Sequence, residues 1–292
     1  YSRLKQGVFM ESVYEYVSVN LKFKKKNELA FPFLDFGFLY GYGLFESIKV
    51  KNGIPLLLEY HFSRLKRGSI ILDIPFDHTI TELTSHIQKL ILKNKLESAI
   101  LNIYLTPGNR SHDPSIVTIE EPFLLMVTRV WPDYQLNYGV SLELRQESFK
   151  KTPLDRFKTL SWVKNILEKR LSTLSDDVLL YDENGFILET SRANVYFVKD
   201  KTIYTPKSSV ILPGVIRQFL LDKQDEIGYE FKETQIDIHH LSEFDEMFLS
   251  NALRGIFFVK ELLRFDGLES KGVAKDVRES FCKVMEHSVV NV

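Results

Sequence analysis

The sequence contains a single cysteine, Cys282, among its 292 residues. One thiol cannot form an internal disulfide framework or a zinc site that uses several cysteines, so both are excluded. The pair His239-His240 has acidic neighbours, but adjacent side chains of an extended segment point in opposite directions and cannot share one ion. We therefore expect no metal centre in this protein.

Long hydrophobic runs are also lacking. No apolar stretch approaches the roughly twenty residues that a membrane-spanning helix requires. The segment from Tyr1 to Asn20 contains no continuous apolar run of the kind found in secretory signals. We therefore expect a cytoplasmic protein without a membrane segment.

The sequence shows no excess of charge of one sign, because 38 basic residues balance 39 acidic ones. The densest basic cluster, Lys22 with Lys24 to Lys26, is predicted to be a solvated loop or turn, so no nucleic-acid partner is expected. Several phosphate-binding and nucleophile motifs are missing too: G-x-S-x-G, the Walker A loop and G-x-G-x-x-G. A serine hydrolase or a dinucleotide-binding enzyme is therefore disfavoured.

What the chain does contain is enough apolar material for a large core, with 44% hydrophobic residues, 22 Phe and 13 Tyr. Strand-like and helix-like patterns alternate in two halves of similar size, which predicts an α/β (α+β) fold. Trp131-Pro132-Asp133-Tyr134 interrupts the pattern. We expect an N-terminal domain over 1–130, whose first 30 residues form a possible extension, a linker over 131–138, and a C-terminal domain over 139–292.

Periodicity predicts the individual elements. Helices are expected over 59–71, 80–95, 161–174, 213–227 and 274–289. Strands are expected over 46–51, 99–105, 123–130, 140–144, 229–236, 247–250 and 256–259, with a β-meander over 177–206.

Lys158 is the first candidate for chemistry. It stands just before a predicted helix, between apolar neighbours such as Phe157 and Leu160. Partial burial of this kind disfavours the charged form of a lysine and makes its amine available as a nucleophile or base. A single surface lysine is the simpler interpretation, and only its possible partners later in the chain favour a catalytic one.

Glu189 comes later, at the end of a predicted strand, and Asn194 lies in the next turn. A carboxylate here can hold a protonated ring nitrogen, and Asn194 can stabilise the loop through backbone hydrogen bonds. Gly214, Val215 and Ile216 then open a helix whose free N–H groups attract an anion. Asn251 and Ala252 offer either a second set of such donors or a tight turn.

A pyridoxal phosphate enzyme requires these features: an amine for the cofactor aldehyde, an acid for the ring nitrogen and backbone donors for the phosphate. Their order in the chain resembles the class IV aminotransferase family, the fold-type-IV pyridoxal phosphate enzymes. The resemblance begins near Asp35 and rests on the segments Asp35–Glu46, taken as an opening strand motif, Glu59–Leu65, Phe157–Leu160, Glu189–Phe197 and Leu212–Arg217.

The resemblance implies a smaller N-terminal α/β domain and a larger C-terminal domain with a β-barrel-like core. It implies that Lys158 forms the Schiff base with the cofactor and that Arg64 binds the phosphate. Members of the family are typically homodimers. By the same resemblance, the small amino substrate is expected to contact Phe45, with Arg110 and His112 as candidates for binding its carboxylate.

Two reactions on this cofactor remain open. One is the 4-amino-4-deoxychorismate lyase reaction, which forms p-aminobenzoate and pyruvate; the other is transfer of an amino group from a branched-chain or D-amino acid to a 2-keto acid. The segment Ser250 to Leu253 resembles a loop of the lyases and favours that reaction slightly. A non-catalytic cofactor-binding protein is the third hypothesis, disfavoured because binding alone does not require both Lys158 and Glu189.

Overall fold

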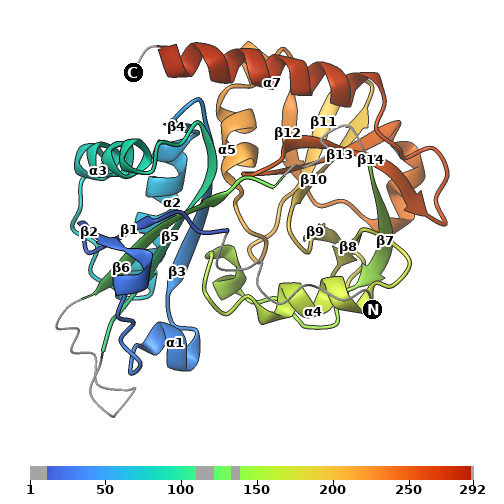
Figure 1. Ribbon diagram of the computed structural model, residues 1–292. Helices are drawn as coiled ribbons and strands as arrows, with labels where there is room; N and C mark the ends of the chain where they lie inside the picture. Colours follow the sequence, from blue (N-terminus) through green and yellow to red (C-terminus); the bar gives the residue numbers. More distant parts are fainter. Residues whose placement is uncertain (1–11, 110–121, 133–138, 291–292) are drawn as a thin grey trace. The chain divides into compact units, whose positions relative to one another are not determined.

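The computed structural model describes residues 12–109, 122–132 and 139–290 (Figure 1). The chain forms two compact units, one of residues 1–133 with Lys158–Ser161 and the other of residues 134–157 and 162–292. The segment Lys158–Ser161 thus packs with the first unit, although the second unit has already begun. Arg110 and His112 lie outside the described residues.

The first unit contains a six-stranded sheet in the order β2-β1-β6-β5-β3-β4. Its paired strands run antiparallel. The strands are β1 (Tyr16–Val19), β2 (Lys22–Lys25), β3 (Leu44–Lys51), β4 (Ile54–Pro55), β5 (Ser98–Thr106) and β6 (Phe123–Val130). The helical segments are η1 (Lys26–Glu28), α1 (Phe36–Tyr40), α2 (Leu58–Ile71) and α3 (Ile80–Lys93).

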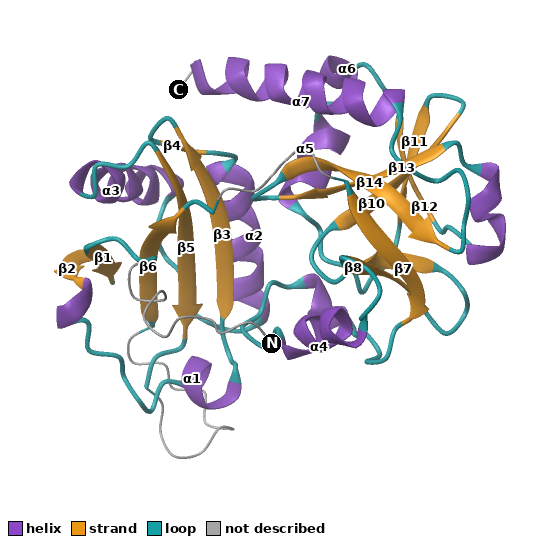
Figure 2. Ribbon diagram, turned by 45° about the vertical axis from the view of Figure 1, so that its right-hand side comes forward, coloured by secondary structure: helices purple, strands orange, loops and turns teal. Residues whose placement is uncertain are grey.

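The two faces of β3 have different roles, because successive side chains of a strand point to opposite sides. Leu44, Glu46 and Ile48 are buried on one face. Helix α2 packs against this strand (Figure 2). Phe45 points to the other face and is only partly buried. A carboxylate is therefore buried beneath a helix, while the aromatic ring beside it in sequence lies on the opposite face.

The second unit contains an eight-stranded sheet in the order β12-β11-β10-β13-β14-β7-β8-β9, which curls into a half-barrel (Figure 1). The pairs β11–β12, β14–β7 and β7–β8 are parallel. The strands are β7 (Val140–Gln146), β8 (Asp177–Tyr181), β9 (Ile187–Thr190), β10 (Asn194–Lys199), β11 (Thr202–Pro206), β12 (Phe231–Thr234), β13 (Glu246–Asn251) and β14 (Gly255–Leu263). The helical segments are η2 (Pro153–Arg156), α4 (Val163–Leu171), α5 (Val215–Asp222), α6 (Gln224–Ile227), η3 (Ile238–Glu243) and α7 (Gly272–Val290).

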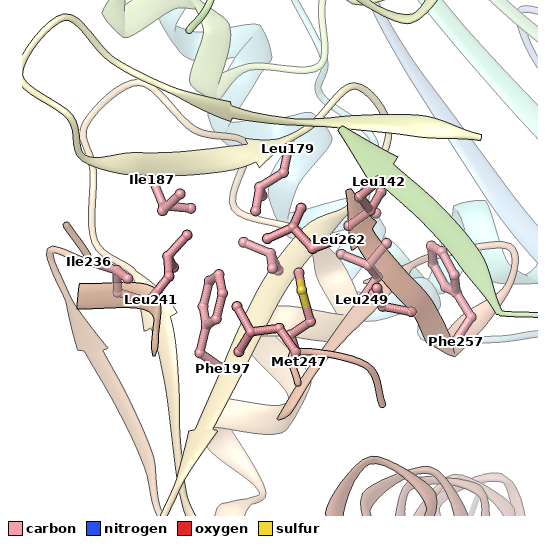
Figure 3. Packing of buried hydrophobic residues seen from close by; sticks show 14 residues of the cluster. Leu142, Leu179, Ile187, Phe197, Ile236, Leu241, Met247, Leu249, Phe257 and Leu262 are labelled. Carbon is pink, nitrogen blue, oxygen red and sulfur yellow. The ribbon is translucent and has the colours of Figure 1, made fainter. Parts of the chain in front are cut away.

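Each face of this curled sheet has its own packing. One face gathers a cluster of buried apolar side chains that includes Phe197, Met247 and Leu249 (Figure 3). Helices α5 and α7 pack against β13 and β14. The alternate residue Tyr196 stacks on Phe248 with ring centroids 4.6 Å apart. The half-barrel is therefore held by apolar contacts on both sides, which makes it a firm support for residues at its strand ends.

Two expectations about the N-terminal part are wrong. The segment Phe36–Tyr40 is a helix and not the start of a strand, because Asp35 caps it by accepting from the Phe38 N–H and Gly41 ends it at a φ of 68°. The basic run Lys22–Lys25 is a strand and not a loop. It pairs with β1, a partner that local composition does not reveal.

Some helix boundaries also differ from the periodic pattern. The helix expected over 213–227 is divided at Lys223 into α5 and α6, and Gly228 ends the second piece in the left-handed region. The helix expected over 161–174 is shorter and covers Val163–Leu171. Within the described ranges, no helix is both long and apolar enough to cross a membrane.

Candidate active site

Lys158 lies on a short extended segment that runs beside the start of β3. The Phe45 N–H donates to the Lys158 carbonyl at 2.9 Å, and the Leu160 N–H donates to the Gly43 carbonyl at 2.9 Å. A side chain on Gly43 would come within 2.8 Å of Leu160 Cδ1, so the glycine permits this close approach. The lysine is therefore fixed by backbone pairing to a rigid strand.

The side chain of Lys158 lies over the partly buried face of the first sheet. Its Nζ is 4.3 Å from the centroid of the Phe45 ring. Phe45 in turn stacks on Tyr104 of β5, with centroids 6.4 Å apart. Burial raises the pKa of the Tyr104 hydroxyl, so Tyr104 stays neutral and can donate a hydrogen bond. The amine therefore stands beside an aromatic surface with a neutral polar edge.

An arginine on the next strand is held on the same face. Arg129 Nε donates to Asn102 Oδ1 at 2.8 Å. Asn102 is buried, and its Nδ2 donates to Ser47 Oγ at 2.7 Å. The register places Phe45 opposite Tyr104 and Ser47 opposite Asn102. The arginine is thus oriented by a side-chain network while its guanidinium remains partly exposed.

Arg64, the expected phosphate ligand, belongs to a buried cluster beneath the first sheet. Its Nε and Nη2 donate to the two oxygens of Glu46 at 2.7 and 2.6 Å. His61, one helical turn earlier on α2, hydrogen-bonds Glu46 Oε2 through Nδ1 at 2.6 Å. The bidentate pair orients the guanidinium, because the two parallel bonds fix its plane.

The charges in this cluster are unequal. Burial tends to raise the pKa of Glu46, but the Arg64 guanidinium and His61 lower it to about 2. Burial lowers the pKa of His61, and Glu46 opposes that shift only in part. The cluster therefore consists of an ionised Glu46, a charged Arg64 and a histidine biased towards its neutral form.

Glu189 ends β9 in the second unit and is held from several directions. Its Oε1 accepts from Lys151 Nζ, and the two side chains are only 7% and 6% exposed. The Leu212 N–H points at both oxygens, at 3.2 and 3.3 Å. Asn194 Nδ2 donates to Oε2 at 3.2 Å. The structure thus brings together Glu189, Asn194 and the turn before α5, as a cofactor-binding role requires.

The start of α5 supplies backbone donors. Gln218 N–H makes an intrahelical bond to the Gly214 carbonyl at 2.9 Å, the first of this helix. The N–H groups of Val215, Ile216 and Arg217 precede that bond and have no intrahelical acceptor. Such groups, with the helix dipole, attract a phosphate.

Gly214 has a structural role that its sequence position did not indicate. A side chain there would come within 2.0 Å of Asn194 Oδ1. Asn194 also donates through Nδ2 to the Leu212 carbonyl at 2.9 Å. The glycine therefore makes room for the asparagine that links Glu189 to the start of the helix.

Asn251 holds a tight turn after β13. Its Oδ1 accepts from the N–H groups of Leu253 and Arg254, at 3.2 and 2.9 Å. Of the two alternatives for this segment, the structure shows the turn. Ala252 lies within it, and any contact of this turn with a phosphate would come from its backbone.

Sequence reasoning attached no role to Lys151, Glu46 or His61. The i, i+3 spacing of His61 and Arg64 on one helix could have suggested a shared partner. Nothing local distinguishes Lys151 from Lys150, whose side chain is 71% exposed and pairs with Glu183 at 2.7 Å. No group of three or more His, Cys, Asp or Glu side chains suited to a metal ion occurs in the part of the chain that the structure describes.

Comparison with known proteins gives a consistent family. A family model described as amino-transferase class IV matches residues 43–262. The chain is 27% identical over 268 residues to an aminodeoxychorismate lyase of Bacillus subtilis (strain 168), covering 87% of this chain and 86% of the relative. It is 26% identical over 286 residues to a D-alanine aminotransferase of Staphylococcus aureus (strain MSSA476), covering 94% of this chain and all of the relative (100%).

A solved structure shares the fold. The branched-chain amino acid aminotransferase of T.th., complexed with N-(5'-phosphopyridoxyl)-L-glutamate, superposes with a TM-score of 0.83 at 22% identity. The match covers 93% of this chain and 94% of that one. Because the family model spans well over half of the sequence, the chain belongs to the amino-transferase class IV family.

Proposed function

We propose that this protein is a pyridoxal phosphate-dependent class IV enzyme that acts on a small amino substrate, with the 4-amino-4-deoxychorismate lyase reaction favoured. The observation that carries the proposal is the buried Glu189 carboxylate beside the donor groups of α5. The family uses pyridoxal phosphate, and one structural relative is bound to a phosphopyridoxyl compound. The described residues therefore fit this cofactor.

Lys158 is assigned the catalytic role. When bound, pyridoxal phosphate stabilises the negative charge that develops on the carbon next to the substrate amine. The Lys158 amine binds the cofactor aldehyde in the resting enzyme and then moves protons as general base and acid. Its backbone pairing to Phe45 and Leu44 limits where Nζ can reach, which keeps proton transfer directed at one position.

Glu189 is assigned to the ring nitrogen and the start of α5 to the phosphate. A negative partner keeps the ring nitrogen protonated, and only then does the ring accept negative charge well. Arg64 is a second phosphate candidate, because Glu46 fixes its orientation while the guanidinium has more donors than Glu46 uses. Asn194, Gly214, Val215, Ile216, Asn251 and Ala252 complete the proposed cofactor site.

An anionic group on the substrate is the second element of the proposal. Arg129 is held by Asn102 on the sheet face that carries Phe45, the aromatic ring beneath Lys158 Nζ. A guanidinium oriented in this way suits a carboxylate. We assign it to a substrate carboxylate, alongside Arg110 and His112.

The lyase reaction is favoured over amino transfer by two features. The turn at Asn251 has the sequence that resembles the lyases, and a Bacillus subtilis lyase is among the relatives. In that reaction the C–O bond to the enolpyruvyl group breaks, pyruvate leaves and the ring becomes aromatic. Amino transfer to a 2-keto acid is the alternative, supported by the D-alanine aminotransferase relatives.

Two experiments test the proposal. Borohydride reduction of protein incubated with pyridoxal phosphate should attach the cofactor to Lys158, as read by peptide mass spectrometry. Labelling elsewhere, or none, contradicts the cofactor assignment. Production of p-aminobenzoate from aminodeoxychorismate then identifies the lyase, and amino exchange with a set of 2-keto acids identifies the transaminase. We also expect a homodimer and a cytoplasmic location, to be checked by light scattering and by fractionation.

A further inference from the structure

Lys151 has no part in the chemistry proposed above, yet its side chain is almost fully buried against Glu189. The ammonium donates to Glu189 Oε1, and the side chain of the lysine is 7% exposed. The other donors to this carboxylate, Leu212 N–H and Asn194 Nδ2, are neutral. Among the described residues, Lys151 is therefore the cation that compensates the charge of Glu189.

The backbone around Lys151 is fixed by two further carboxylates. The Lys151 N–H donates to Glu147 Oε2 at 2.9 Å. Just before it, the N–H groups of Ser148 and Phe149 donate to the buried Glu168 at 2.6 and 3.1 Å. A lysine normally loses much conformational freedom when it forms one ion pair. Here the chain leading to it is already ordered, which lowers that cost.

Burial decides what this pair can do. Exposed ion pairs contribute little, because water screens the charges. A buried pair is different, since removing one partner leaves an uncompensated charge in the interior. The donors of Leu212 and Asn194 reach both oxygens of Glu189, while the ammonium is directed at Oε1. The ammonium thus fixes the rotation of the carboxylate and supports its negative charge.

We propose that Lys151 is a positioning residue that acts through Glu189: it holds the carboxylate charged and oriented for the protonated nitrogen of the cofactor ring. This inference rests on the proposed function, because it presupposes that Glu189 binds that nitrogen. It adds a residue outside the Lys158, Glu189 and phosphate groups. It also divides two adjacent lysines, since Lys150 is solvated and pairs with an exposed glutamate.

The test compares Lys151→Met, Lys151→Arg and the matched control Lys150→Met. Pyridoxal phosphate is titrated into each apoprotein, and its dissociation constant is read from absorbance. A hydrogen bond to a charged group is involved, so Lys151→Met should weaken cofactor binding about tenfold or more. Lys151→Arg keeps the charge and should recover most of this loss. Lys150→Met should bind as wild type does.

Two further readouts separate positioning from a general loss of structure. The pH at which the bound cofactor changes its absorption should move in Lys151→Met and not in Lys150→Met. In a Glu189→Gln background, Lys151→Met should cause little additional loss of binding, because the residue through which it acts has gone. If Lys151→Met does not fold, the same comparison is made with Lys151→Arg and the double variant.

The outcomes are distinct. Wild-type binding and an unmoved pH midpoint in a folded Lys151→Met protein overturn the inference, as does an equal loss in Lys150→Met. Losses from Lys151→Met and Glu189→Gln that simply add also overturn it. If wild-type protein does not label at Lys158 with borohydride, the proposed function fails and the inference fails with it. Labelling at Lys158 together with an insensitive Lys151→Met removes the inference alone.

Discussion

The two units each bury a carboxylate against a cation, but they do so in different ways. Glu46 is held by two side chains of one helix, Arg64 and His61, and its two oxygens serve the arginine. Glu189 is held by a lysine, an amide and a backbone N–H from separate parts of the chain.

The difference shows which group each carboxylate serves. A bidentate pair with Arg64 uses Glu46 to orient a cation, so the arginine is the group presented outward. Glu189 accepts from several weaker donors, so the carboxylate itself is the group being positioned. Similar burial thus supports opposite roles, and substitutions in each cluster can separate them.

The largest expected effect lies at the lysine that both clusters are proposed to assist. Lys158→Ala should lower turnover by a factor of about 10² to 10⁴, the usual contribution of a general acid–base group. Thermal unfolding should change little, since the residue is only partly buried. Lys164→Ala is the matched control, because Lys164 lies on α4 and pairs with Asp155. Steady-state kinetics on both variants measures the effect; equal rates would remove Lys158 from the mechanism.

Arg64→Met should break the first cluster most severely. It leaves Glu46 ionised in the interior without its main partner, which costs about 3–5 kcal/mol of stability. Arg67→Met, at an exposed position on the same helix, should cost little. Urea unfolding of the two variants measures the difference. A stable Arg64→Met protein would show that His61 or solvent can compensate Glu46, contrary to the assigned role.

Glu46→Gln should remove a specific part of the pH dependence of stability. The folded-state pKa of Glu46, about 2, lies below its ordinary value of 4.5. Glu46 therefore stabilises the fold fully above pH 4.5, and this contribution disappears as the pH falls towards 2. It amounts to on the order of 3 kcal/mol by linkage. The stability difference between wild type and Glu46→Gln should shrink between about pH 5 and pH 3, as measured by urea unfolding; a constant difference contradicts the assignment.

Gly214→Ala should disturb the second cluster without removing any charge. The added methyl group would displace Asn194, whose Oδ1 lies 2.0 Å from the position of that carbon. We expect a loss of about 1–3 kcal/mol in stability. Weaker cofactor binding should accompany it, because Asn194 donates to Glu189. Gly272→Ala is the control, since nothing lies within 4 Å of a side chain there. Similar losses in both variants would contradict the proposed link.

Arg129→Met is expected to have the smallest effect, confined to the substrate. Losing one ionic contact with a substrate carboxylate should raise KM about tenfold or somewhat more. Cofactor binding should not change. Kinetics with substrates that carry or lack a second carboxylate measures the effect, and an equal change for both kinds would remove the assigned specificity.

Much of the fold was accessible from periodicity. The strands near 46–51, 99–105 and 123–130 and the helix near 59–71 were predicted close to their observed bounds. The short helix Phe36–Tyr40 was missed, because an N-cap and a terminal glycine acted over only five residues. Strand β2 was missed because its stability depends on pairing with β1 and not on its own composition.

The candidate site divides in a similar way. The sequence by itself determined which residue types are present and in what order: Lys158, then Glu189 and Asn194, then the glycine that opens a helix. Only the tertiary structure decided that Lys151 and not Lys150 meets Glu189, and that Gly214 makes room for Asn194. The physical reason is that pattern and composition act along the chain, whereas the pairing of buried charges depends on which distant segments the fold brings within a few ångströms.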